Sequence, residues 1–225
     1  MQLGQYPAPG HVVAHVSDPH LLAGDARQYG VIHPEAGLRL ALERLTRLDP
    51  APQALVFTGD LADRAEPAAY DRLRELVEPV AEALSATVVW VMGNHDERAE
   101  YAKSLFGEAD ESPQDRVHDV AGLRIVALDT TVPGYHHGGF SDAQYAWLTR
   151  ELATPAPHGT VLVIHHAPIT YRSPVMQLLD FDDVDRLRAA VAGTDVRAVL
   201  SGHLHVTPAT AILPQFASEG PQRSL

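Results

Sequence analysis

A chain of 225 residues, of which 45% are apolar, is long enough to bury a core, and its size predicts one domain over residues 1–225. A net charge of −12 without any Lys/Arg-rich run argues against a nucleic acid polymer as partner, since such binding neutralises many phosphates. Without cysteine, any metal must be held by oxygen and imidazole ligands. The sequence contains neither a run of about 20 apolar residues nor a recognisable signal peptide, so we expect a cytoplasmic protein without a transmembrane segment.

Short β-rich runs alternate with segments that have helical patterns. The runs lie at residues 11–16, 54–57, 88–92, 124–128, 161–164 and 196–200. Their near-continuous apolar character suits strands that are covered on both faces. Helices are predicted at residues 34–48, 66–86 and 141–152. Strands separated by helices indicate crossover connections and a layered α/β fold.

The predicted helices are supported by different local signals. In the first helix, Leu38, Leu42, Leu45 and Leu48 fall on one face, which is typical of a helix packed against a core. The third helix begins with Ser141 and Gln144 at the spacing of a capping box, in which each residue bonds the backbone of the other.

Polar clusters directly follow five of the predicted strands. They are Ser17-Asp18-Pro19-His20, Thr58-Gly59-Asp60-Leu61-Ala62-Asp63, Gly93-Asn94-His95-Asp96, His165-His166-Ala167-Pro168 and Ser201-Gly202-His203-Leu204-His205. If the strands run parallel, their carboxyl ends share one edge of the sheet, where open α/β folds bind ligands. We therefore expect the five clusters to meet.

The residue types in these clusters favour a metal site. Asp, Asn and His supply donors that suit Mn, Fe or Zn, and the glycines before Asp60, Asn94 and His203 allow sharp turns close to the site. Taken singly, Asp18 with His20 or Gly59 with Asp60 is more typical of a turn or cap. The presence of all five clusters, each directly after a strand, favours a joint role. For Asp63 and Asp96, support of ligand histidines and helix capping are both open.

These residues resemble the signature of the calcineurin-like metallophosphoesterases. The motif is made of Asp18-x-His20, Gly59-Asp60, Gly93-Asn94-His95-Asp96, His165 and Gly202-His203-x-His205. The stretches VFTGDLAD, VWVMGNHD and HHAPI are most similar to the bacterial class III cyclic-nucleotide phosphodiesterases. The resemblance extends from about residue 11 to His205. It implies a four-layer αββα sandwich with two metal ions about 3.5–4 Å apart.

The resemblance also implies roles for individual residues. One metal ion would be held by Asp18, His20, Asp60 and His205, and the other by Asp60, Asn94, His165 and His203, so that Asp60 bridges the two. His95 and Asn94 would act on the reacting phosphate, with His95 as the catalytic histidine that binds neither metal. His166 would point away from the metals and pack or support the ligands. His136, in the loop 134–139, would reach the substrate pocket, although a plain solvated loop is an equal alternative.

The implied activity is metal-dependent hydrolysis of cyclic nucleotides by a metal-bridging hydroxide. The substrate would be 3′,5′-cAMP, a 2′,3′-cyclic nucleotide or both, and the protein would form a homodimer. Two divalent ions, two aspartates and a hydroxide give a site charge of roughly +1, which suits a phosphodiester monoanion. The alternatives are another small phosphodiester or phosphomonoester, such as a glycerophosphodiester, and a binding scaffold of this fold without turnover.

The C-terminal tail departs from the family pattern. Family members continue well beyond the last histidine motif, whereas 20 residues (225 − 205) follow His205 here. Residues 211–216 allow one short strand, and Pro214 interrupts even that. We therefore expect the second sheet to be incomplete at the C-terminus, with an exposed edge, reduced stability and a tendency to self-associate.

Overall fold

The computed structural model describes residues 8–169, 177 and 179–205. Its elements are, in chain order, β1 (Val13–Val16), α1 (Pro34–Leu45), β2 (Ala54–Thr58), α2 (Pro67–Leu84), β3 (Thr87–Val91), α3 (Arg98–Phe106), β4 (Arg116–Val120), β5 (Leu123–Ala127), α4 (Asp142–Leu152), β6 (Thr160–Val163), α6 (Val184–Val191) and β7 (Val196–Leu200). Each of the predicted strands is present within two residues of its expected bounds. The tail 206–225, with the short strand and incomplete sheet expected there, lies outside the described residues.

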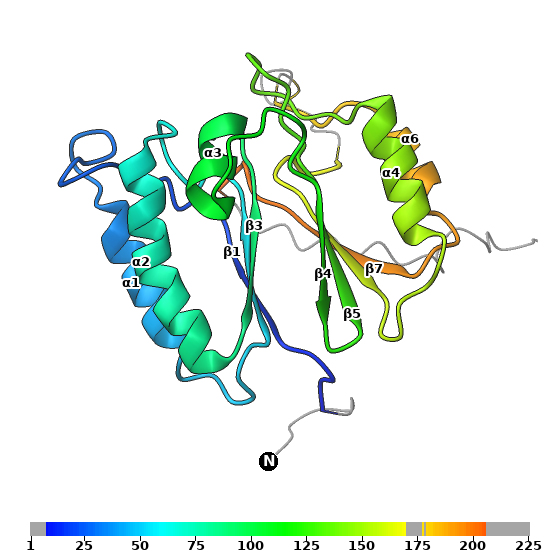
Figure 1. Cartoon of the computed structure of the whole chain (residues 1–225), viewed down its shortest axis with the longest axis horizontal. Helices are drawn as coiled ribbons and strands as arrows, with labels where there is room; N and C mark the ends of the chain where they lie inside the picture. The colour runs from blue at the N-terminus through cyan, green and yellow to red at the C-terminus, as the bar shows by residue number, and fades with distance from the viewer. Residues whose placement is uncertain (1–7, 170–176, 178, 206–225) are drawn as a thin grey trace, which may run out of the picture.

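Two sheets pack face to face, and helices cover the outer face of each (Figure 1). The first sheet is parallel, in the order β1-β2-β3. The second has the order β4-β5-β6-β7, in which β4 is antiparallel to β5 and the other pairs are parallel. Helices α1 and α2 cover the first sheet, whereas α4 and α6 cover the second (Figure 1). The predicted αββα sandwich is thus confirmed.

The apolar strands are buried because both of their faces are covered. In β2, Leu55 and Phe57 pack in the cluster that includes α1 and α2, while Ala54 and Val56 pack in the cluster between the sheets. The residues of β5 alternate in the same way. Ile125 packs between the sheets, and the next residue, Val126, packs toward α4 and α6. Alternate residues of one strand thus join different cores, which accounts for the near-continuous apolar runs.

The helix boundaries follow local chemistry. Helix α4 begins with the predicted capping box, since Ser141 accepts from the Gln144 backbone N–H and the Gln144 side chain accepts from the Ser141 backbone. The first predicted helix is too long, because α1 ends at Leu45 and Leu48 is 47% exposed. The chain leaves the helix ahead of Pro50, which could not continue it. No helix in the described part of the chain is apolar and long enough to cross a membrane.

Candidate metal centre

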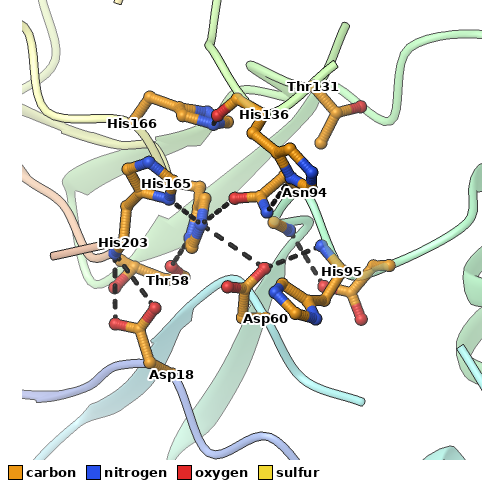
Figure 2. Close-up of polar contacts among 12 residues, drawn as sticks. Asp18, Thr58, Asp60, Asn94, His95, Thr131, His136, His165, His166 and His203 are labelled. Atoms are coloured by element: carbon orange, nitrogen blue, oxygen red, sulfur yellow. Dashed lines mark hydrogen bonds and ion pairs between the residues drawn. The ribbon is translucent and has the colours of Figure 1, made fainter. Parts of the chain in front are cut away.

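Residues from the loops after β1, β2, β3, β6 and β7 lie close together (Figure 2). The expectation that the clusters meet is correct, but the strands that carry them belong to two sheets rather than to one parallel edge. The loops are tied together by backbone hydrogen bonds, from His20 N–H to Asp60 O (2.9 Å) and from Gly202 N–H to His165 O (2.9 Å). Between the two halves, the backbone N–H of His203 donates to Asp18 Oδ1 at 3.0 Å, so the site joins both sheets.

Close packing of the loops requires glycine at two positions before predicted ligands. A Cβ atom on Gly59 would lie 2.3 Å from His165 Nδ1, and one on Gly93 would lie 2.2 Å from both Asp60 N and Asp60 Oδ1. Since neither approach leaves room for a side chain, these glycines let the β2 and β3 loops press against each other and against His165.

Five of the seven predicted ligands have left-handed backbone conformations. They are Asp18, His20, Asp60, His203 and His205, with φ between 43° and 74°. This conformation is uncommon in residues other than glycine, and it persists where the surrounding structure enforces it. Such residues cluster at functional sites, and their concentration in these loops indicates a site that is held in a fixed geometry.

The first group of donors is made by Asp18, His20 and His205. His205 Nε2 lies 3.2 Å from His20 Nε2 and 3.7 Å from Asp18 Oδ1. His20 Nε2 also lies 3.4 Å from Asp60 Oδ2. Two imidazoles and two carboxylates thus direct donor atoms toward one small volume, an arrangement that suits a cation.

The second group of donors surrounds His165. Its Nε2 lies 3.1 Å from Asn94 Oδ1, 3.2 Å from His203 Nδ1 and 3.4 Å from Asp60 Oδ1. The other ring nitrogen, Nδ1, donates to the backbone oxygen of Thr58 at 2.8 Å, which leaves Nε2 as the ligating atom of the neutral ring. The two oxygens of Asp60 therefore face different donor groups. Oδ1 faces His165 of the second group (Figure 2), and Oδ2 faces His20 of the first.

The ionised Asp60 carboxylate governs the electrostatics of the buried cluster. Although burial favours the neutral carboxyl, His165 and the backbone N–H of His95 hold the pKa of Asp60 well below its usual value. Burial lowers the pKa of His165, but Asp60 outweighs it and raises that pKa to about 9. Burial and His165 lower the pKa of His203 to about 4. Oxygen and imidazole donors in this charge balance fit one or two ions such as Mn, Fe or Zn.

Asp63 supports two histidines of the cluster. Its Oδ1 lies 3.1 Å from His20 Nδ1, and its backbone oxygen accepts from His95 Nδ1 at 2.9 Å. Metal-ligating histidines commonly use their second nitrogen in this way, which fixes the ring. Of the two alternatives left open for Asp63, support of a histidine therefore describes its contacts, since α2 begins at Pro67.

Asp96 takes neither of the roles considered from the sequence. Its buried carboxylate accepts from the backbone N–H groups of Leu61, Ala62 and Gly93 and from the Tyr70 hydroxyl. Burial, with the nearby Asp60 charge, raises the pKa of Asp96 to about 6. The Asp96 side chain thus holds the backbone of the loops after β2 and β3 together, and these loops carry Asp60 and Asn94.

Replacement of Asp96 by alanine should destabilise the fold strongly. Several buried backbone N–H groups would lose their acceptor, and leaving one such group unsatisfied costs about 1–3 kcal/mol, so we expect a loss of at least about 3 kcal/mol. The control Tyr70→Phe removes one bond to the same carboxylate and should cost about 1 kcal/mol. Urea unfolding in EDTA measures both without a contribution from metal binding. Equal losses in the two variants would contradict this role.

The remaining predicted residues lie around Asn94. The backbone N–H of His95 donates to Asp60 Oδ1 (2.9 Å), and its side chain is 38% exposed. His136 Nδ1 accepts from Asn94 Nδ2 at 3.2 Å, so the loop 134–139 reaches the cluster (Figure 2). A cavity of about 280 Å³ lies beside Asn94, between the first turn of α3 and residues 131–135.

His166 is buried beside the second donor group, and burial lowers its pKa well below the usual value. Its two ring nitrogens contact Thr130 Oγ1 (2.8 Å) and the backbone oxygen of His136 (3.0 Å). Both nitrogens are therefore engaged by protein atoms, as expected for a supporting residue rather than a ligand. The ring lies at 4.5 Å, between centroids, from that of His203.

One polar cluster was not singled out from the sequence. Asp129, Thr130 and Thr131 follow β5 after one further apolar residue, Leu128, in a pattern like that of the five predicted clusters. Buried Asp129 accepts from Arg98 Nε of α3 at 2.8 Å and from the Thr131 hydroxyl at 2.6 Å. This ion pair anchors the loop that carries His136, and the polar run after a strand was the available signal.

Comparison with known proteins identifies the family. The model of the calcineurin-like phosphoesterase family matches residues 11–207. A cAMP/cGMP dual specificity phosphodiesterase of Mycobacterium tuberculosis is 50% identical over 206 residues, which cover 91% of this chain and 65% of that protein. A glycerophosphodiester phosphodiesterase of Enterobacter lignolyticus is 28% identical over 200 residues, covering 86% of this chain and 70% of that protein. This chain thus spans about two thirds of the length of these relatives.

The fold is shared with solved structures of more distant sequence. A dimetal phosphatase from Danio rerio superposes with a TM-score of 0.63 at 16% identity, covering 87% of this chain and 82% of that one. At this identity the likeness bears on the fold alone. The match of the family model over most of the chain, together with the αββα sandwich, shows that the chain belongs to the calcineurin-like phosphoesterase family.

Proposed function

We propose that this protein is a metal-dependent phosphodiesterase that hydrolyses cyclic nucleotides. The observation that carries the proposal is Asp60, whose two oxygens face two separate groups of metal donors. Two cations that share a carboxylate form the clamp on which phosphate ester hydrolysis commonly depends. The name of the relative at 50% identity, a cAMP/cGMP dual specificity phosphodiesterase, supports the substrate class.

The seven predicted ligands fit two metal ions. Asp18, His20, Asp60 and His205 would hold the first, and Asp60, Asn94, His165 and His203 the second. Such ions lower the pKa of water and offset the negative charge that develops on a reacting phosphate. The mixture of imidazole and oxygen donors suits Mn, Fe or Zn.

His95 would serve the leaving oxygen. Because its Nδ1 donates to the backbone oxygen of Asp63, a proton carried on the other nitrogen, Nε2, is the one that can be given away. We assign His95 the transfer of this proton to the alkoxide that leaves phosphorus, as a general acid. Its partial exposure leaves the ring accessible to a substrate.

Asn94 and His136 would orient the phosphate. The amide oxygen of Asn94 faces His165, while its amide nitrogen donates to His136 Nδ1. The neutral His136 ring then carries its proton on Nε2, from which it can donate to a phosphate oxygen. The cavity of about 280 Å³ next to Asn94 is close to the size range of small-ligand pockets.

A second substrate class has support of its own. The relative from Enterobacter lignolyticus is a glycerophosphodiester phosphodiesterase, and the same donor groups would serve that phosphodiester. We place it second because the identity is 28%, against 50% for the cyclic nucleotide enzyme.

We also propose that the protein forms a homodimer and is located in the cytoplasm.

A substrate panel tests the proposed function. With Mn²⁺ present, we expect hydrolysis of 3′,5′-cAMP, of 2′,3′-cAMP or of both, and weaker turnover of glycerophosphocholine. The general diester bis(p-nitrophenyl) phosphate should be cleaved as well, and EDTA should abolish every activity because the proposed chemistry needs the cations. Turnover of glycerophosphocholine alone would favour the second class. No hydrolysis of any diester, by a protein that binds metal, would indicate a scaffold.

A further inference from the structure

The buried ring of His166 lies against the proposed metal ligands, yet it contacts neither Asp60 nor Asn94. It packs edge to face on His165, with ring centroids 4.9 Å apart. With His165 and His203 it forms a trio of histidines close enough to hold an ion. Its two nitrogens are, however, already taken by Thr130 Oγ1 and by the backbone oxygen of His136. The ring thus packs against proposed ligands, but its hydrogen bonds go to Thr130 and to the loop 134–139 that carries His136.

The hydrogen bonds of His166 allow one arrangement of protons. A backbone oxygen can only accept, so the His166 proton must lie on Nε2 and point at His136 O. In the neutral ring Nδ1 then accepts, and the Thr130 hydroxyl is its donor. Every polar atom of the buried ring is satisfied in this tautomer, which is why the arrangement can hold a loop in place.

The loop above His166 is built around that ring. Its two ends meet through an isolated bridge between Thr131 and Gly138, and Gly138 forms a second bridge with Phe181. A Cβ atom on Gly138 would lie 2.4 Å from His166 Cγ, so the ring fills the space below the base of the loop. His136 lies near the tip, where its ring accepts from Asn94.

We propose that His166 is a positioning residue that fixes His136 over Asn94 and so sets how tightly the substrate phosphate is held. The path runs from the Thr130 hydroxyl through His166 to the backbone oxygen of His136, and from the His136 ring to Asn94. The inference rests on the proposed function, in which His136 donates to the phosphate. It assigns His166 no contact with substrate or metal.

Two variants of similar size separate the two bonds of His166. In His166→Gln an amide nitrogen can reach the place of Nε2 and donate to His136 O, whereas His166→Asn keeps an acceptor near Nδ1 and loses that donor. We expect His166→Asn to raise KM for bis(p-nitrophenyl) phosphate by about 3- to 10-fold, the equivalent of one neutral hydrogen bond. The kcat value and two metal ions per chain should be retained. His166→Gln should have nearly wild-type KM.

A double-mutant cycle shows whether His166 acts through His136. His136→Ala should raise KM to a similar extent, and the double variant with His166→Asn should be no worse than His136→Ala alone. Additive increases would overturn the proposal, as would a loss of metal in His166→Asn, which would place its effect on His165 and His203. If His166→Asn does not fold, Thr130→Val removes the hydroxyl donor and should raise KM in the same direction; an unchanged KM would contradict the path.

A spectroscopic measurement tests the arrangement apart from activity. Long-range ¹H–¹⁵N correlation of the imidazoles in the metal-free protein should identify His166 as the ring whose signals disappear in His166→Gln, and that ring should be protonated on Nε2 only. A proton on Nδ1 would overturn the inference. If wild-type protein loaded with Mn²⁺ cleaves no diester, the proposed function fails, while the tautomer result still decides whether His166 holds the loop as described.

Discussion

Replacing Asp60 by alanine is expected to remove metal from both halves of the centre and to reduce activity at least about 100-fold. Loss of a residue that merely supports a ligand lowers metal affinity or activity by about 10- to 100-fold, and a shared ligand should matter more. Asp60 is also buried and contacts both His20 and His165. Metal content by mass spectrometry of the dialysed protein, measured beside kcat/KM with Mn²⁺, provides the readout.

Two further carboxylates serve as matched comparisons. Asp18 belongs to the first donor group, so Asp18→Ala should keep about one metal ion, held by the group around His165. Asp71 is exposed on α2, and Asp71→Ala should keep both ions and full activity. If Asp60→Ala retains two ions, Asp60 does not bridge, whatever happens to the rate.

Replacing His95 by alanine should lower kcat by about 10²- to 10⁴-fold, the range for loss of a general acid. Metal content should hardly change, because the His95 ring donates to the Asp63 backbone and is assigned to neither donor group. A substrate with a good leaving group, such as bis(p-nitrophenyl) phosphate, should be affected less than cAMP, since p-nitrophenolate needs little protonation.

The comparison variant for His95 is His33→Ala. His33 is an exposed histidine at the start of α1, where its side chain makes no capping bond, and its removal should leave both kcat and metal content unchanged. The trio of His20, Asp60 and His95 is close enough to hold an ion, which makes ligation the rival role. A His95→Ala protein that has lost one ion but turns over normally at the remaining sites would establish that role instead.

Much of the centre could be predicted because each polar cluster comes directly after an apolar strand. The segment around β3 is a clear case, since the apolar run at residues 88–92 leads through Gly93 into Asn94 and His95. The layered fold could also be predicted from these runs, because a strand that is apolar on both faces must be covered by another layer on each side. The resemblance to a known family supplied the second sheet, which periodicity alone did not show.

Three described elements, β4, α3 and α6, were not predicted from the sequence, and the first two lack that signal. In β4, Arg116, His118 and Val120 alternate in burial with more exposed residues, so the strand carries no apolar run. Helix α3 buries two residues, Tyr101 and Ala102, which is too few to produce a visible helical repeat. Among the described strands, β4 is also at the edge of the second sheet, with a neighbouring strand on one side only.

Contacts between distant loops were also beyond the sequence pattern. The Asp96 carboxylate accepts from Leu61, 35 positions earlier, and His166 bonds Thr130, 36 positions earlier. The position of Asp96, directly after His95, indicates a support for a ligand histidine or a helix cap. Asp96 is buried under the loop after β2, and this burial determines its contacts. It depends on the pairing of β2 with β3, which the sequence pattern does not show.

Titration of the metal-free protein with Mn²⁺, while cAMP hydrolysis is followed, tests the central claim most directly. If Asp60 joins two ions in one catalytic centre, hydrolysis should be low after one equivalent per chain and should reach its maximum as the second binds. Isothermal titration of the same sample should give two ions per chain. Full activity after a single equivalent, or unchanged activity in metal-free protein, would contradict the proposed two-metal centre.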